Sequence, residues 1–143
     1  MEQPEYKYLE DLEVGQTAEW DALVDEKAVN AFAELTGDRN PVHVDEEYAK
    51  TTVYGTRIAH GALTASYISA VLGNILPGPG AIFTGMELRF RRPVPVGSDV
   101  KAVAEVAEIN EKTRRVTMKV KCLANGKPAV SGIAHVVVPR REG

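Results

Sequence analysis

The stretch GALTASYISAVLGNI, residues 61–75, decides the fold that we predict for this chain. Its large apolar residues are Leu63, Ile68, Val71, Leu72 and Ile75, and its small residues are Ala62, Ala65, Ser66, Ser69, Ala70 and Gly73. A helix that is apolar on nearly every side is expected to be buried, and small side chains let neighbouring elements approach it closely. We therefore predict a buried helix from Gly61 to Ile75 with a sheet wrapped around it. The simpler alternative is an amphipathic helix that lies on one face of a sheet.

The sequence that follows this helix has the period of β-strands. Its alternating apolar sets are Met86, Leu88 and Phe90, then Val100, Ala102, Ala104 and Val106, then Val116, Met118, Val120 and Cys122. Asn125-Gly126 is a strong hairpin signal, and residues 129–138, AVSGIAHVVV, supply a final strand. Consecutive strands joined by short turns predict an antiparallel sheet. Because the helices are grouped earlier in the chain, the predicted class is α+β.

The sequence before the central helix predicts one more strand and one more long helix. Residues 17–24, TAEWDALV, alternate in the manner of a strand. Asp25 is a good N-cap for a helix with apolar residues at helical spacing, and Gly37 suits its left-handed C-cap. Residues 38–58 are expected to be irregular, apart from a short helix after Asp45.

Length and composition exclude several classes of function. With 143 residues, 44% of them hydrophobic, residues 1–143 are expected to form one domain with its own core. A net charge of -3 argues against binding to nucleic acid or an anionic membrane, and no apolar run approaches the ~20 residues of a membrane span. The acidic N-terminus lacks the apolar region of a signal peptide, so a cytoplasmic location is expected. The single cysteine, Cys122, excludes an internal disulfide and a cysteine-based zinc site.

The segment TGDRNPVHVD, residues 36–45, is the main candidate for chemistry. Its residue types are common in turns, so an ordinary polar turn is the competing interpretation. Pro41 has a fixed φ and biases Asn40 toward an extended backbone, which makes the connector between Asp38 and His43 stiff. A stiff connector holds a carboxylate and an imidazole at one separation, as general acid–base catalysis requires. The Asn40 amide can brace the turn.

The start of the helix at Gly61 adds a third element to this candidate site. The first N–H groups of a helix have no partner within it, and the positive end of the helix dipole favours a developing oxyanion. The spacing of His43 and His60 is not that of a helical metal-binding pair, so we expect no metal. His135 lies in a predicted strand and is expected to be structural.

Two segments together resemble a known family. Residues 32–49, FAELTGDRNPVHVDEEYA, followed by residues 54–69, YGTRIAHGALTASYIS, are similar to the MaoC-like (R)-specific enoyl-CoA hydratases. These are hotdog-fold proteins, in which a sheet wraps a long central helix. The hydratase motif of the family is matched by Phe32, Gly37, Asp38, Asn40, Pro41, Val42, His43 and Ala49. Residues 87–99, ELRFRRPVPVGSD, also look like the family's later strand and turn, so the similarity spans nearly the whole chain.

This resemblance implies a reaction and a set of residue roles. The reaction is the reversible syn addition of water to a trans-2-enoyl thioester, which gives the (R)-3-hydroxyacyl product and needs no cofactor. Asp38 and His43 match the catalytic pair, and the backbone N–H of Gly61 matches the group that polarises the thioester carbonyl. Ser69 matches a further active-site residue, with helix packing as its alternative role. Asn40 completes the residues assigned to the substrate site.

The resemblance also implies partners. A homodimer with a catalytic cleft at the subunit interface is expected, and coenzyme A is preferred over acyl carrier protein as the carrier. Strand alternation predicts that Arg89 and Arg91 are accessible to solvent, and one of them is expected to meet a coenzyme A phosphate. A plain solvated sheet face is the competing interpretation. Many relatives have Met where this chain has Ala62, so the preferred acyl length is not implied.

Three other functions compete with hydration. A (3R)-hydroxyacyl-ACP dehydratase would run the same chemistry in the opposite direction. A hotdog thioesterase is disfavoured because residues 37–43, GDRNPVH, lie on the hydratase side of the resemblance. A catalytically silent hotdog subunit, acting as a binding module, would have no need for both Asp38 and His43.

Overall fold

A five-stranded antiparallel sheet and one long helix make up most of the computed structural model, which describes residues 6–142. The strand order is β1-β3-β4-β5-β2, and every neighbouring pair is antiparallel. The strands are β1 (Thr17–Val24), β2 (Ile82–Phe90), β3 (Ser98–Asn110), β4 (Arg115–Ala124) and β5 (Lys127–Val137). The predicted α+β class and antiparallel sheet are confirmed.

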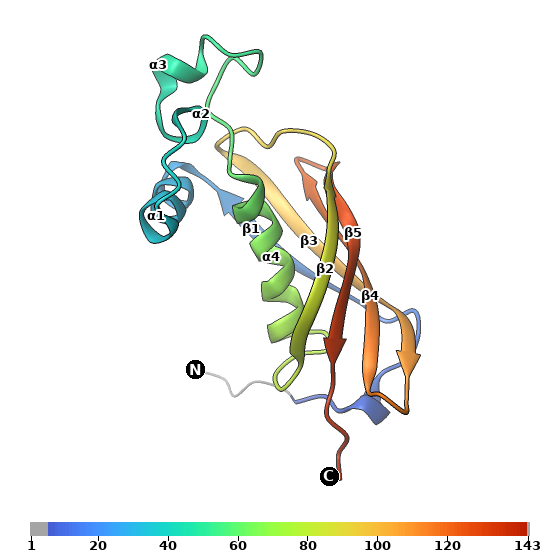
Figure 1. The fold of residues 1–143 in the computed structure, drawn as a ribbon. Helices are drawn as coiled ribbons and strands as arrows, with labels where there is room; N and C mark the ends of the chain where they lie inside the picture. The colour runs from blue at the N-terminus through green and yellow to red at the C-terminus, as the bar shows by residue number, and fades with distance from the viewer. Residues whose placement is uncertain (1–5, 143) are drawn as a thin grey trace.

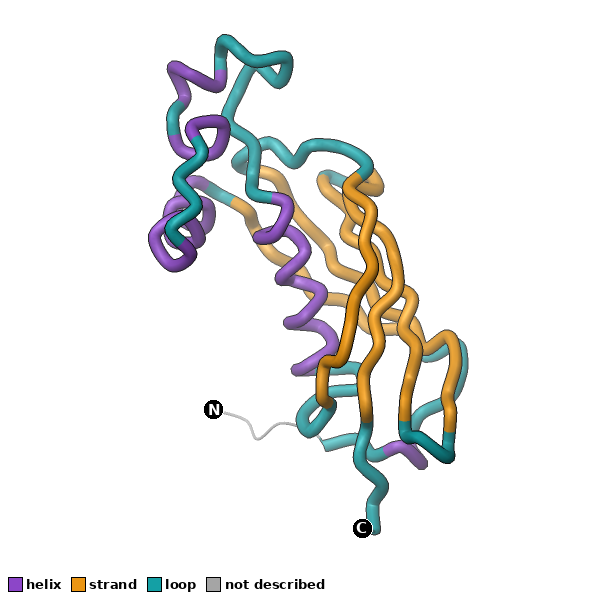
Figure 2. The backbone as a smooth tube through the Cα atoms, in the orientation of Figure 1, coloured by secondary structure: helices purple, strands orange, loops and turns teal. Residues whose placement is uncertain are grey.

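The helices lie on one side of this sheet and beyond one of its ends (Figure 1). They are α1 (Glu26–Thr36), α2 (Pro41–Val44), α3 (Glu46–Ala49) and α4 (Gly61–Asn74), with a short 3-10 helix η1 (Leu9–Asp11) before β1. Helix α4 runs along the sheet, whereas α2 and α3 form a protrusion near its first turn (Figure 2). The segment from residue 38 to 58 therefore contains two short helices, where the sequence predicted one. None of the helices in the described part of the chain is long and apolar enough to cross a membrane.

Local signals produce the predicted boundaries of α1. The Asp25 carboxylate accepts a hydrogen bond from the N–H of Ala28 at 2.9 Å, which satisfies one of the unpaired donors of the first turn. Gly37 ends the helix with a φ of 83°, and its N–H donates to the carbonyl of Ala33 at 2.9 Å. A residue with a Cβ atom is disfavoured in this left-handed conformation. Asp38 therefore leaves α1 in a direction set by the glycine.

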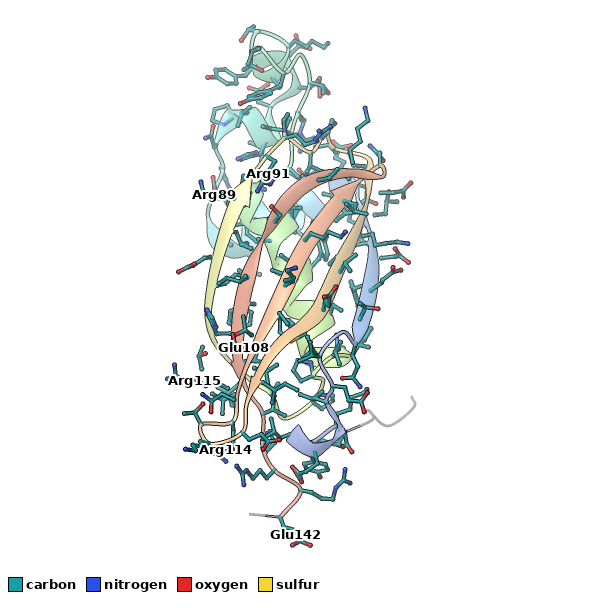
Figure 3. All side chains as sticks on the ribbon, turned by 90° about the vertical axis from the view of Figure 1, so that its right-hand side faces the viewer. Arg89, Arg91, Glu108, Arg114, Arg115 and Glu142 are labelled. Atoms are coloured by element: carbon teal, nitrogen blue, oxygen red, sulfur yellow. The ribbon has the colours of Figure 1, made fainter. Side chains whose placement is uncertain are left out.

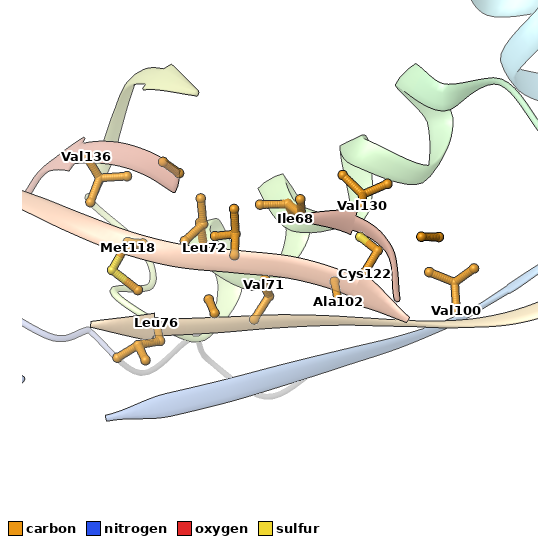
Figure 4. Packing of buried hydrophobic residues seen from close by; sticks show 14 of the residues in the cluster. Ile68, Val71, Leu72, Leu76, Val100, Ala102, Met118, Cys122, Val130 and Val136 are labelled. Carbon is orange, nitrogen blue, oxygen red and sulfur yellow. The ribbon is translucent and has the colours of Figure 1, made fainter. Parts of the chain in front are cut away.

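Helix α4 supplies the centre of the hydrophobic core. Ile68, Val71 and Leu72 point from α4 toward the sheet, where Met118 and Cys122 of β4 meet them (Figure 4). Full burial of side chains of this size stabilises a fold by about 1.5–3 kcal/mol each. These contacts fix α4 on the sheet and so set the position of its N-terminus.

The prediction that α4 is buried on nearly every side is wrong for this single chain. One stripe of the helix is exposed, and it consists of Ala62, Ser66, Ser69 and Gly73. Their spacing of four, three and four residues places them on a single helix face. The sheet covers only the opposite face, so the small residues do not pack against it.

Strand β2 is also less buried than its alternation predicts. Met86 is 38% exposed and Phe90 is 58% exposed, while Leu88 is half-buried. The reason is the place of β2 at the edge of the sheet, where β5 is its only neighbour in the strand order. Alternation gives the two faces of a strand, but it does not say whether another element covers either face.

Cys122 is a buried thiol and is expected to be unreactive. Its Sγ donates to the carbonyl of Thr64 at 3.5 Å, and burial raises the pKa of Cys122 to about 12. Because the thiolate is the nucleophile, native protein at pH 8 is expected to release almost no thionitrobenzoate from Ellman's reagent. One equivalent should react after unfolding in guanidinium chloride. Rapid reaction of one equivalent in the native protein would contradict this placement.

Candidate active site

The turn between α1 and α2 holds Asp38 through its own polar groups. The N–H of Asp38 donates to the Thr36 hydroxyl at 3.2 Å, and the Asp38 carboxylate accepts the N–H of Asn40 at 3.2 Å. Asn40 has the predicted extended backbone, with φ -55° and ψ 126°, and its side chain caps α2 by accepting the N–H of Val42 at 3.3 Å. Pro41 begins α2, where its missing N–H costs nothing. Asn40 therefore braces the turn, as predicted.

Helix α2 brings His43 back toward Asp38. The Nδ1 atom of His43 donates to the carbonyl oxygen of Ile58 at 2.8 Å. A ring nitrogen that bonds to a carbonyl must carry hydrogen, so Nδ1 is protonated and Nε2 of the neutral ring keeps its lone pair. The half-buried His43 thus offers one basic nitrogen in a fixed orientation.

A second histidine, His60, lies against this pair. Its ring is only 2% exposed and stacks on His43 with 4.0 Å between centroids and 29° between planes. Its Nε2 donates to the backbone carbonyl of Asp38 at 3.0 Å. The ring of Phe32 packs against His60 with 4.8 Å between ring centroids. One carboxylate oxygen of Asp38 and one ring nitrogen of each histidine lie within 4.8 Å of one another, which makes these three residues the candidate ligands for a metal ion here.

Gly61 lies beside these groups at the first position of α4. It shares a cavity of about 310 Å³ with His43, Tyr54, Ile58, Ala59, Thr64, Phe90, Arg91, Arg92, Pro93, Val94 and Val130. A Cβ atom on Gly61 would lie 2.9 Å from the Phe90 ring. Because glycine has no side chain, the ring can pack directly against the first residue of α4. His43 and the first residue of α4 therefore line one cavity.

A larger depression of about 590 Å³ lies at Asp21, Asp99 and Lys101. Histidine is missing from its lining, and none of the residues of the hydratase motif contributes to it. Size alone does not indicate chemistry, and neither His43 nor the first turn of α4 borders this depression. The smaller cavity beside His43 is the candidate active site.

Arg57 connects His43 to α1. This role was not predicted from the sequence. Its side chain is buried, and its Nε donates to the backbone carbonyl of His43 at 2.6 Å. The other guanidinium nitrogens reach Glu26 at 3.0 Å and Asn30 at 2.7 Å. These partners lie 14 to 31 residues away in sequence, and no local pattern marks an arginine for such contacts.

The structure separates the other predicted site residues. Ser69 is exposed on α4 and lies outside the cavity that His43 and Gly61 line. Arg91 lines that cavity, and its Nε donates to the Ser131 hydroxyl at 2.6 Å. Arg89 is absent from that cavity and lines a second depression along β2 and β5, which Arg91 also borders. Figure 3 shows both arginines near the end of β2, with Arg91 closer to the helical protrusion. Both are exposed, as predicted.

The fold and the site define a class: a hotdog domain with an Asp–His pair beside the N-terminus of its central helix. The chain belongs to the MaoC-like domain family, whose model matches residues 10–127. It is 46% identical to the (R)-specific enoyl-CoA hydratase of Rhodospirillum rubrum over 94% of this chain and 93% of the relative. It is 47% identical to the 3-hydroxybutyryl-CoA dehydratase of Methylorubrum extorquens over 94% of this chain and 86% of the relative. The unliganded (R)-hydratase PhaJ1 of Pseudomonas aeruginosa superposes with a TM-score of 0.90 at 43% identity, covering 95% of this chain and 88% of that one.

Proposed function

We propose that this protein is an (R)-specific enoyl-CoA hydratase, which adds water reversibly and in the syn sense to trans-2-enoyl-CoA. One observation carries the proposal: a carboxylate oxygen of Asp38 and one ring nitrogen of His43 lie within 4.8 Å of each other beside the first turn of α4. The hydratase and dehydratase names of the relatives at 46–47% identity support the same chemistry.

In the proposed mechanism one water molecule lies between the two side chains. It donates hydrogen bonds to the Asp38 carboxylate and to Nε2 of His43, so its lone pairs are free to attack C3 of the enoyl group. Asp38 accepts a proton from this water as the C3–O bond forms. His43 holds the water, and the proton that Asp38 accepted passes to C2 on the same face, so one water supplies both the hydroxyl at C3 and the hydrogen at C2. Addition from one face gives the (R)-3-hydroxyacyl thioester.

The oxygen of the thioester gains negative charge as C3 is attacked. The N–H of Gly61 is one of the first donors of α4, and it lines the same cavity as His43. A donor already oriented toward a developing oxyanion stabilises the transition state more than the ground state. We assign this role to the Gly61 backbone. Asn40 supports the turn that carries Asp38. Ser69, outside this cavity in a single chain, stays a prediction of the resemblance.

We propose that the reaction uses no metal ion. Nδ1 of His43 and Nε2 of His60 already donate to backbone carbonyls. Each ring therefore has one nitrogen left, and that of His60 is buried. Coordination of a single ion requires convergent donors, whereas proton transfer requires only that one basic nitrogen face the substrate.

The direct test follows crotonyl-CoA with purified protein. Loss of the enoyl thioester absorbance, with formation of (R)-3-hydroxybutyryl-CoA, is the expected result. Release of free thiol without a hydroxyacyl product would make the protein a thioesterase instead. An inert protein under the same conditions would support the silent binding subunit. Preference for crotonyl-ACP over crotonyl-CoA would favour the carrier-protein dehydratase.

We further propose that Arg91 contacts a phosphate of coenzyme A. Arg91 lines the candidate cavity, and a guanidinium is suited to phosphate. Replacing Arg91 with Ala is expected to raise KM for crotonyl-CoA on the order of tenfold with kcat nearly unchanged, because a remote contact binds ground and transition states alike. The effect should weaken as salt rises.

Arg89 provides the matched control for this prediction. It is exposed on β2, two residues before Arg91, and it does not line the cavity beside His43. Arg89→Ala is expected to keep the KM of the unchanged protein at low salt. A raised KM in Arg89→Ala, together with an unchanged KM in Arg91→Ala, would reverse the assignment.

We also propose that the functional form is a homodimer. The exposed stripe of α4 and the edge strand β2 form an uncovered surface that carries Ile82, Phe83, Met86 and Phe90. An unpaired strand edge with apolar side chains is a favourable site for pairing with a second copy. A mass in solution equal to one 15.5 kDa chain would contradict this proposal. A cytoplasmic location remains a prediction of the sequence.

A further inference from the structure

His60 is the buried titratable residue at the site that the proposed mechanism does not use. It is the N-cap residue of α4, yet its side chain makes no capping hydrogen bond with that helix. Instead the ring reaches the backbone of Asp38 and the ring of His43, while its own backbone leads into Gly61. A single side chain thus joins the three parts of the proposed catalytic apparatus, where the start of α4 meets the segment around α2 (Figure 1).

The hydrogen bond to Asp38 determines the tautomer of His60. Nε2 bonds to a carbonyl oxygen at 3.0 Å, so it must carry hydrogen. Nδ1 is buried and has no hydrogen-bond partner among residues 6–142. A proton placed on Nδ1 would bury a charge and a donor without an acceptor, which is costly. The arrangement is therefore that of a neutral ring with its donor aimed at the Asp38 backbone.

Two consequences follow for the neighbours of His60. The bond to the Asp38 carbonyl holds the turn that carries the carboxylate, in addition to the bonds from Thr36 and Asn40. The stacked ring also supports His43 from one face, while the bond from Nδ1 to Ile58 holds its edge.

We propose that His60 is a positioning residue for the hydration reaction: it orients the Asp38 carboxylate through the backbone and the His43 imidazole through stacking. The proposal rests on the proposed function. It assigns His60 no contact with the substrate, so its loss should lower kcat and leave KM nearly unchanged. A displacement of about 1 Å in a catalytic group is enough to cost on the order of 100-fold in rate.

Three variants of His60 separate its hydrogen bond to the Asp38 carbonyl from its stacking on His43. His60→Phe keeps a ring against His43 but has no donor for the Asp38 carbonyl. His60→Gln keeps an N–H donor near the place of Nε2 but has no ring. His60→Ala removes both. His60→Ala is expected to lose on the order of 100-fold in kcat, and the Phe and Gln variants should each recover part of that loss, with KM within about threefold throughout.

His135 is the control for a histidine outside the site. It is half-buried in β5, and His135→Gln is expected to keep wild-type kcat and KM. Thermal melting of each variant separates loss of positioning from loss of folding. A folded His60→Ala protein with wild-type kcat would overturn the proposal. A raised KM with an unchanged kcat would also overturn it.

A spectroscopic measurement on the unaltered protein and two of these variants tests the proposal independently of activity. Imidazole ¹⁵N–¹H spectra of the three histidines should show His60 with hydrogen on Nε2 and His43 with hydrogen on Nδ1. In His60→Phe the His43 signals should keep that tautomer, and in His60→Ala they should show a mixture. Hydrogen on Nδ1 of His60 would overturn the positioning role. Failure of the unaltered protein to hydrate crotonyl-CoA would overturn the proposed function, whereas the two tautomers can be observed whether or not the protein hydrates crotonyl-CoA.

Discussion

Asp38→Asn and His43→Gln are each expected to lower kcat for crotonyl-CoA by roughly 10²–10⁴, the usual contribution of a general acid or base. Asn keeps the shape of Asp38 and an oxygen that can accept the N–H of Asn40, but it cannot take a proton from water. Gln keeps polarity at His43 but lacks a basic nitrogen. Initial rates of crotonyl-CoA consumption give the result, and melting temperatures show whether each variant remains folded.

The double variant and a nearby carboxylate sharpen this prediction. If Asp38 and His43 act on one water, Asp38→Asn combined with His43→Gln should lose little more than the worse single variant, because residues that act as a unit are strongly non-additive. Glu34 is an exposed carboxylate near the same turn, paired with Arg39 at 3.0 Å. Glu34→Gln should retain full activity. Near-normal turnover in either folded single variant would remove the Asp–His assignment.

Gly132→Ala is expected to destabilise the fold by about 3 kcal/mol or more, at the upper end of the usual cost of overpacking. Gly132 lies on β5 opposite Leu88 of β2, and a Cβ there would be 1.9 Å from the carbonyl oxygen of Glu87. The next atoms, at 2.9 and 3.0 Å, also belong to the β2 backbone, so no side-chain rotation relieves the overlap. Strand β2 must move away from β5.

This displacement should be visible in two measurements. The melting temperature should fall by about 10 °C, given roughly 3–4 °C per kcal/mol for a chain of this length. Activity should fall as well, because β2 carries Phe90 and leads into Arg91, and both residues line the candidate cavity. A Gly132→Ala protein that melts within about 2 °C of wild type would show that β5 and β2 are not packed this closely.

Gly85→Ala is the matched control on β2 itself. A Cβ on Gly85 would meet only the Cδ2 atom of His135 at 3.9 Å, which is ordinary van der Waals contact. The control should therefore melt near the wild-type temperature. Comparison of the two variants separates a general effect of removing a strand glycine from the specific overlap at Gly132.

Several features could be predicted from sequence because neighbours along the chain cause them. The Asp25 cap and the Gly37 end of α1 depend on contacts within four residues. The hairpin at Asn125-Gly126 depends on two residues with positive φ, 50° and 82°, as its sequence predicts. Predicted residues 17–24 coincide with β1, and the predicted helix from Gly61 differs from α4 by one residue at its end.

The sequence by itself also predicted which residues carry the chemistry, because Asn40 and Pro41 place Asp38 and His43 at a short, stiff separation. Only the tertiary structure decided how these groups are held. His60 and Arg57 reach the catalytic segment from 14 to 22 residues away, through backbone carbonyls that exist in every residue and leave no mark in the sequence. The tertiary structure also decided what stays exposed, because the sheet covers one face of α4 and β2 lies at the edge of the sheet. Periodicity identifies the faces of an element, but burial depends on what the rest of the chain places against them.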